Sequence, residues 1–219
     1  MKRLSDFVSH SLVTERIERK FLMPQGHSST ARAFLISNGF VETYRARMVR
    51  SVYFDTKEYS CLRDNIDGNP FRDKLRVRFY DANYSTARIE IKHKRNMLGY
   101  KSMIPLNGIF GTEYDVVDAT KRWSSLNVSE FLVPTARVTY LRRYYTSGWL
   151  RATIDTDIQS EAIIGNKYIT SPGVQYEVVE FKYESMKDAE MRLLFDRIAS
   201  FSLRTTKSSK YSNALVGLI

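Results

Sequence analysis

Basic residues recur at every second position in short segments of this chain, which is the spacing that places side chains on one face of a β-strand. In the segment 74–80, the alternating basic residues are Lys74, Arg76 and Arg78. The segment 88–94 repeats the pattern with Arg88, Glu90, Lys92 and Lys94. Rows of this kind can bind phosphate groups, because arginine holds two phosphate oxygens at once and lysine acts as a point charge.

Two more segments carry charged rows, Arg16, Glu18 and Lys20 in one and Glu180 and Lys182 in the other. A single row is equally typical of the solvated face of an antiparallel sheet, so one row by itself does not indicate function. Several rows together predict a concave surface of mostly like charges. Such a surface requires an anionic ligand to offset its self-repulsion.

The composition indicates a folded and strongly basic protein. The 219 residues carry a formal net charge of +10, and 43% of them are hydrophobic. This charge favours a polyanionic partner, and charge alone leaves open whether it is a phosphate chain, a nucleic acid or a membrane surface. We expect no nucleic-acid ligand, because no RNP, zinc-finger or helix-turn-helix pattern occurs.

Cysteine and histidine usage limits the redox and metal chemistry. Cys61 is the only cysteine, which excludes an intramolecular disulfide and a cysteine-based zinc site and fits a reducing compartment. The three histidines, His10, His27 and His93, lack metal-ligand spacing. A metal would therefore sit on carboxylate and phosphate oxygens, which favours Mg²⁺ or Mn²⁺. With no run of about 18 apolar residues, we expect no membrane span and a cytoplasmic location.

The periodic patterns predict an α+β fold. Strands are expected at 14–23, 50–55, 72–80, 87–94, 100–104, 136–146, 150–157 and 174–183, and helices at 29–37 and 187–200. We interpret 107–132 as a pair of short helices and 56–72 as a turn-rich stretch. About eight mostly antiparallel strands favour a closed β-barrel, because closure removes exposed edges. With no linker composition, residues 1–219 are expected to form one domain, with helices packed outside and the basic rows lining a tunnel.

Eight short segments, taken in order, resemble the polyphosphate polymerase domain of the vacuolar transporter chaperone (VTC) complex, and they lie at 18–21, 52–56, 74–78, 89–92, 140–143, 150–156, 179–182 and 209–211. That domain is one of the triphosphate tunnel metalloenzymes. This CYTH-like superfamily also includes adenylyl cyclases, thiamine triphosphatases and RNA triphosphatases. Each segment alone is a weak signal, and their shared order makes the resemblance specific.

The resemblance implies roles for individual residues. The residues implied to bind phosphates and support catalysis are Lys20, Arg76, Arg78, Lys92, Lys101, Arg142, Arg151 and Lys210. Hydrogen bonds to phosphate oxygens are implied for Tyr140 and Ser209, and ion pairs that orient neighbouring side chains for Glu18, Glu90 and Lys182. Glu180 is implied to be the metal ligand. This set fits phosphoryl transfer, which depends mainly on positioning and charge neutralisation.

The implied activity is a nucleotide- and metal-dependent polyphosphate polymerase that transfers the terminal phosphoryl group of ATP to a polyphosphate chain. One departure is Arg16, which stands where many hydrolytic and cyclase members carry the first glutamate of a pair. Sparse carboxylates disfavour two-metal hydrolysis. Two alternatives stay open: an inorganic or nucleotide triphosphatase, and a non-catalytic module that binds polyphosphate or another polyanion.

Overall fold

A computed structural model describes residues 1–7, 16–96, 98–165, 167–170, 176–199, 204–206 and 209–215. The strands are β1 Arg16–Pro24, β2 Val41–Asp55, β3 Phe71–Tyr80, β4 Asn83–Arg95, β5 Leu98–Pro105, β6 Val133–Ser147, β7 Leu150–Ile164, β8 Lys167–Thr170, β9 Tyr176–Glu184 and β10 Arg204–Thr206. The helices are α1 Ser28–Ser37, α2 Ser60–Ile66, α3 Glu113–Asn127, α4 Asp188–Ala199 and α5 Lys210–Leu215, with 3₁₀ turns at η1 Leu4–Asp6 and η2 Ser185–Lys187.

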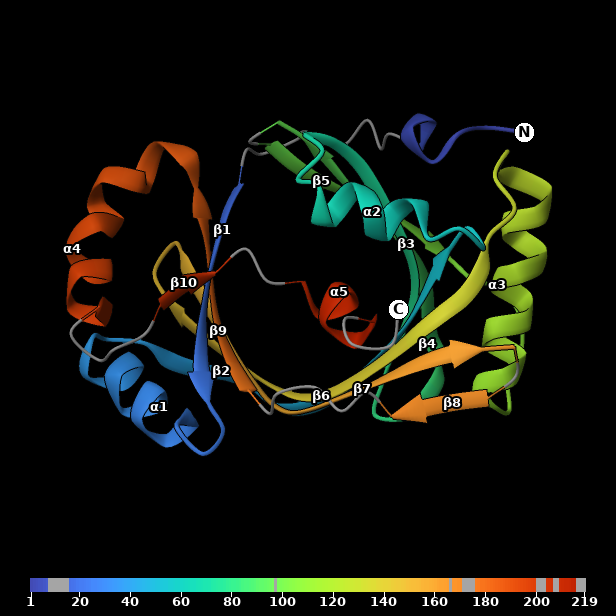
Figure 1. Cartoon of the computed structure of the whole chain (residues 1–219). Helices are drawn as coiled ribbons and strands as arrows, with labels where there is room; N and C mark the ends of the chain where they lie inside the picture. The colour runs from blue at the N-terminus through green and yellow to red at the C-terminus, as the bar shows by residue number, and fades with distance from the viewer. Residues whose placement is uncertain are drawn as a thin grey trace.

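The strands form one antiparallel sheet that takes residues from the whole length of the chain. Its hydrogen-bonded order is β10-β1-β9-β7-β6-β2-β3-β4-β5, and β8 pairs with β7. Figure 1 shows this sheet curving around α5, while α1, α3 and α4 lie outside the curve. The predicted α+β class, the antiparallel pairing and the outer helices are therefore confirmed.

Full closure of the predicted barrel is not confirmed. Within the described residues, no ladder of hydrogen bonds joins β5 to β1 or β10, although Cα atoms of β1 and β5 come within 8 Å of each other. The sheet also has ten strands rather than about eight. The two short strands β8 and β10 hold only four and three residues, too few for an alternating pattern to identify.

The convex face of the sheet is apolar, because every second strand residue packs against a helix. Helices α1 and α4 cover β1, β7 and β9 with a cluster that includes Phe21, Leu35 and Phe195. The second cluster, with Val77, Ile89 and Val116, joins α3 and η1 to β2, β3 and β4. Burial of these apolar positions is what turns the charged positions between them toward the concave side.

Two helix predictions were wrong. Residues 107–132 hold one helix rather than two, α3, which begins at a capping box in which the Thr112 hydroxyl accepts from the Asp115 N–H at 3.2 Å. The stretch 56–72, interpreted as turns, contains α2. The Asp55 carboxylate accepts N–H groups of Thr56, Cys61 and Leu62 at 2.8–3.0 Å, so a side chain from the end of β2 caps this short helix.

Candidate anion-binding site

The concave face of the sheet collects charged side chains from seven strands. The side chains on this face, with the segment that starts α5, are Glu18, Lys20, Lys74, Arg76, Arg78, Glu90, Lys92, Lys101, Arg142, Arg151, Asp155, Glu180, Lys182 and Lys210. All fourteen residues implied by the resemblance lie among the described residues. The sheet places them on one surface, although they come from positions 18 to 210, and their roles toward phosphate stay predictions.

Glu90 on β4 is the shared partner of four cations. Its carboxylate accepts from Arg76 at 2.6 Å and from Lys101 at 3.1 Å. Arg78 and Arg88 lie at 3.7 and 3.6 Å. Burial alone would raise the pKa of Glu90, but the charges of Arg76, Arg78 and Lys101 outweigh burial and hold this pKa well below its usual range. One carboxylate thus serves four positive charges.

Asp155 on β7 lies in the candidate site, and the sequence analysis did not assign it a role. It accepts two hydrogen bonds from Arg142, at 2.6 and 2.7 Å, and one from Lys210 at 2.7 Å. Burial acts to raise the pKa of Asp155, but the charges of Arg142 and Lys210 together outweigh burial. The net pKa is below its usual value, so the carboxylate is ionised. Its position was detectable in principle, since Asp155 shares the alternating face of Arg151. Its ion pair with Lys210 fixes the start of α5 on the sheet.

Two glutamates and two lysines form a second ionic group on β1, β4 and β9. Lys92 donates to Glu18 at 2.6 Å, and Lys182 lies 3.1 Å from Glu180 and 3.6 Å from Glu18. Burial acts to raise the pKa of Glu18, but the charges of Lys92, Lys182 and Lys20 together outweigh it and the pKa falls to about 2. The pKa of Glu180 is also well below its usual range, because Lys182, Lys20 and Arg142 outweigh burial.

Like Asp155, Lys74 on β3 lies in the candidate site but is not among the fourteen residues implied by the resemblance. Its Nζ donates to Asn65 Oδ1 at 2.5 Å and to Ser209 Oγ at 3.0 Å. Burial, followed by the positive charges of Lys92 and Lys20, lowers the pKa of Lys74 to about 7. Its place on this face was predictable, because Lys74 alternates with Arg76 and Arg78 along the strand.

Tyrosine and serine hydroxyls orient the guanidinium groups. Arg78 donates to Tyr140 Oη and to Ser51 Oγ, both at 3.0 Å, and Arg76 donates to Tyr53 Oη at 3.0 Å. The Tyr140 hydroxyl therefore accepts a hydrogen bond from Arg78, and the Ser209 hydroxyl accepts one from Lys74. Arg151, in contrast, lies at the exposed start of β7, paired in register with Lys182.

A preformed metal centre is not part of the described chain, since no group of three histidine, cysteine, aspartate or glutamate side chains there could hold an ion. The chemistry of the donor set nevertheless fits a metal that arrives with its substrate. Glu18 and Glu180 both approach the Lys182 ammonium, and Mg²⁺ is commonly bound by one or two carboxylates together with substrate phosphates.

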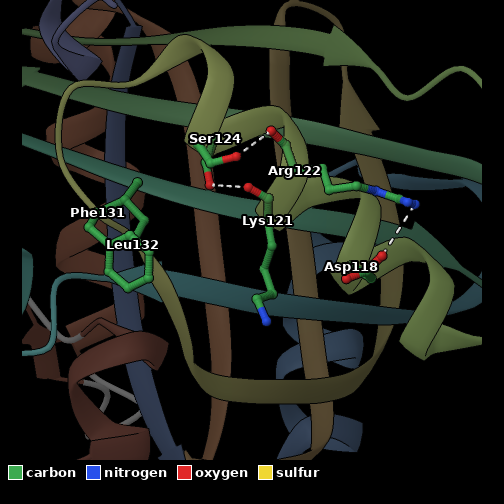
Figure 2. A pocket seen from close by; sticks show the side chains of 7 residues that line it. Asp118, Lys121, Arg122, Ser124, Phe131 and Leu132 are labelled. Atoms are coloured by element: carbon green, nitrogen blue, oxygen red, sulfur yellow. Dashed lines mark hydrogen bonds and ion pairs between the residues drawn. The ribbon is translucent and has the colours of Figure 1, made fainter.

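A pocket on the convex side is separate from this surface. Figure 2 shows it between the second half of α3 and the segment that precedes β6, with Lys121, Arg122 and Phe131 among its lining residues. Arg122 is solvated and pairs with Asp118 at 3.2 Å, one helical turn away. We assign no chemistry to this pocket.

Comparison with known families decides the relationship. The family model described as the VTC domain matches residues 15–219. The chain belongs to the VTC domain family. This match confirms the resemblance drawn from the eight segments. A comparison with curated proteins gave no match.

Solved structures place this VTC domain in the CYTH-like, triphosphate tunnel fold. A candidate adenylate cyclase from Vibrio parahaemolyticus is 12% identical with a TM-score of 0.56, over 90% of this chain and 95% of that one. HpAC1 from Hippeastrum, a candidate adenylyl cyclase described as having a dominant triphosphatase activity, is 15% identical with a TM-score of 0.56, over 93% and 96%. PH1819 from Pyrococcus horikoshii is 9% identical with a TM-score of 0.55, over 93% and 100%. At these identities the likeness shows the fold alone.

None of the helices in the described part of the VTC domain is long and apolar enough to cross a membrane.

Proposed function

We propose that this VTC domain acts as one unit that transfers the terminal phosphoryl group of ATP to a polyphosphate chain on the concave face of the sheet. The observation that carries the proposal is the excess of cations over carboxylates there. Four cations share Glu90, and two share Asp155. Such an excess is costly unless an anion binds, and a triphosphate supplies several negative charges in a row.

The transfer would be a direct displacement. A terminal oxygen of the polyphosphate chain attacks the γ-phosphorus of ATP, the bond to the bridging β–γ oxygen breaks, and ADP leaves with that oxygen. Chain phosphates are already anionic near neutral pH, so the attacking group requires no protein base. The arginines and lysines position the two phosphate chains in line and neutralise the charge that develops on the leaving oxygen.

Glu18 and Glu180 are the carboxylates that would hold a divalent ion together with the phosphates. When bound, Mg²⁺ or Mn²⁺ supplies positive charge to the phosphate oxygens. Enclosure of the chains in a tunnel is supported by the Glu18 to Lys92 ion pair, which joins β1 to β4, near the two ends of the sheet.

A triphosphatase is the second candidate, favoured by the fold shared with HpAC1 and its dominant triphosphatase activity. Hydrolysis differs from polymerisation only in the attacking group, which is water instead of a phosphate oxygen. The balance therefore depends on whether the site admits a phosphate chain or water opposite the leaving group. A site that bound phosphate chains without turnover would be a polyanion-binding module.

Incubation with ATP and Mn²⁺ tests the three readings, with ADP followed by chromatography and polymer by gel. Polymer formed together with ADP, and lost in Lys92→Ala, is the expected result. Arg143→Ala is the matched control, because Arg143 is partly exposed and pairs with Glu42 outside the site. Orthophosphate without polymer would instead indicate the triphosphatase, and tight binding without ADP would indicate the binding module.

A further inference from the structure

One end of the concave face carries a second group of arginines outside the implied site. The first half of β2 extends beyond β3, since β2 pairs with β6 from Val41 but with β3 only from Val49. Arg45 and Arg47 lie on this extension. Arg47 pairs in register with Arg142, so the extension continues the concave face toward solvent. Beside it is the two-residue turn between β3 and β4.

Tyr80 holds two of these arginines in place. The Arg47 guanidinium lies 4.4 Å from the centre of the Tyr80 ring, and that of Arg88 lies 5.2 Å from it. Arg88 also donates to Tyr80 Oη at 3.0 Å. Because the ring already packs against two guanidiniums, it orients cations rather than offering a free face to a nucleotide base. We call Arg45, Arg47, Tyr80, Asp81 and Arg88 the mouth cluster.

The mouth cluster has more positive charge than its carboxylates neutralise. Arg45 and Arg47 share Asp81, at 3.8 and 3.2 Å. The Arg88 Nε atom is buried and lies 3.6 Å from a Glu90 carboxylate oxygen, beyond hydrogen-bond distance, and Glu90 pairs with three other cations. Among the described residues, Asp81 is thus the one carboxylate that the three arginines of the cluster do not share with the inner site. The net positive charge that remains favours an anion at this place.

The cluster connects the inner site to solvent. Arg78, with a side chain 8% exposed, is the register partner of Arg88 on the neighbouring strand, and Arg88 is 39% exposed. Arg45 is 86% exposed. Toward the other end of this face, Leu62 of α2 and Tyr211 and Leu215 of α5 pack with apolar side chains of the sheet. Figure 1 shows α5 inside the curve of the sheet. The continuous basic path therefore leaves through the mouth cluster.

We propose that the mouth cluster is a second phosphate subsite, which binds the phosphoryl groups of a polyphosphate chain that extend beyond those held in the inner site. This inference rests on the proposed function and adds a chain-length preference to it. Arginine forks suit the repeating oxyanions of such a chain. A triphosphate held in the inner site is expected to engage the exposed Arg45 and the neighbouring Arg47 less than a longer chain does.

The double variant Arg45→Ala and Arg47→Ala tests the subsite. Dissociation constants are measured at one fixed salt concentration for inorganic triphosphate and for long-chain polyphosphate, because affinities for polyanions depend on salt. We expect the affinity for long chains to fall by roughly tenfold or more, as loss of charge-assisted hydrogen bonds would give, and that for triphosphate to change less than about twofold. Arg143→Ala, with a side chain 42% exposed, is the matched control and should change neither.

Each outcome distinguishes the subsite from the function on which it rests. Retained triphosphate affinity in the double variant also shows that the protein is folded. An equal loss for both ligands, or no loss for either, would overturn the subsite while leaving the inner site in place. A wild-type protein that bound neither ligand would overturn the proposed function together with this inference. The conservative Arg45→Lys and Arg47→Lys variant should recover part of the long-chain affinity.

Discussion

The Glu18 carboxylate lies 2.6 Å from the Lys92 ammonium, although the strands that carry them, β1 and β4, are not neighbours in the sheet. The two strands lie near opposite ends of its hydrogen-bonded order. Because β1 also approaches β5, the neighbour of β4, this ion pair links the two ends of the curled sheet, where no described backbone ladder joins them.

Glu18→Gln should destabilise the protein in a pH-dependent way. The pKa of Glu18 falls from 4.5 to about 2 on folding, so its contribution to stability is fully present above pH 4.5 and is lost as pH falls toward 2. For this partly exposed pair we expect a loss of about 1 kcal/mol at pH 7 and a smaller loss at pH 3, measured by urea unfolding. An equal loss at both pH values would contradict the assignment. Glu190→Gln, on the exposed surface of α4, is the control and should cost less than about 0.5 kcal/mol.

Asp155→Asn should be among the more damaging single changes in the site. It leaves two cations, Arg142 and Lys210, without their buried counter-charge, and breaking a buried pair costs roughly 3–5 kcal/mol. Thermal unfolding measures the loss. Added triphosphate should raise the melting temperature more in this variant than in the wild type, because the ligand supplies the missing negative charge. Asp118→Asn, the control, removes a solvated partner of Arg122 and should cost under about 0.5 kcal/mol. If Asp155→Asn cost no more than this control, the buried ion pair would not be the source of stability.

Triphosphate affinity should fall as pH rises above 7. The pKa of Lys74 is about 7 in the free protein, and a bound polyanion raises it, so binding takes up a proton in the range above pH 7. The dependence is at most about tenfold per pH unit. Calorimetry in buffers of different ionisation enthalpy measures the proton uptake. In Lys74→Arg, which stays charged, both effects should be reduced. Identical pH profiles for the two proteins would refute a titrating Lys74.

Ala82→Gly should stabilise the protein. Asp81 and Ala82 both have φ of +53°, a left-handed conformation that costs a residue with a Cβ about 1–2 kcal/mol. Glycine removes this cost and loses about 0.5–1 kcal/mol through chain entropy, so a net gain of about 0.5–1 kcal/mol is expected from urea unfolding. Ala119→Gly, within α3, is the control. Ala119 is helical, so glycine there loses chain entropy without relieving a left-handed backbone, and the change should cost about 1 kcal/mol. A loss of stability in both variants would rule out strain at the turn.

Much of the site was predictable because strand alternation is a local property. The rows 74–78, 88–92 and 180–182 share a face by geometry alone, and their apolar neighbours fix which face is buried. The helix α2 was not predictable in this way, because its first turn is capped by Asp55 from the preceding strand rather than by a residue of its own periodic pattern.

The sequence by itself determined the α+β class, the charged faces of the strands and the family to which they belong, since each depends on residue types and spacing along one segment. Only the tertiary structure decided which charges meet. Asp155 reaches Lys210 across 55 residues, Glu18 reaches Lys92 across 74, and Arg47 comes to lie over Tyr80. Strand order, register and sheet curvature set these contacts, and they arise from long-range packing that local periodicity does not encode.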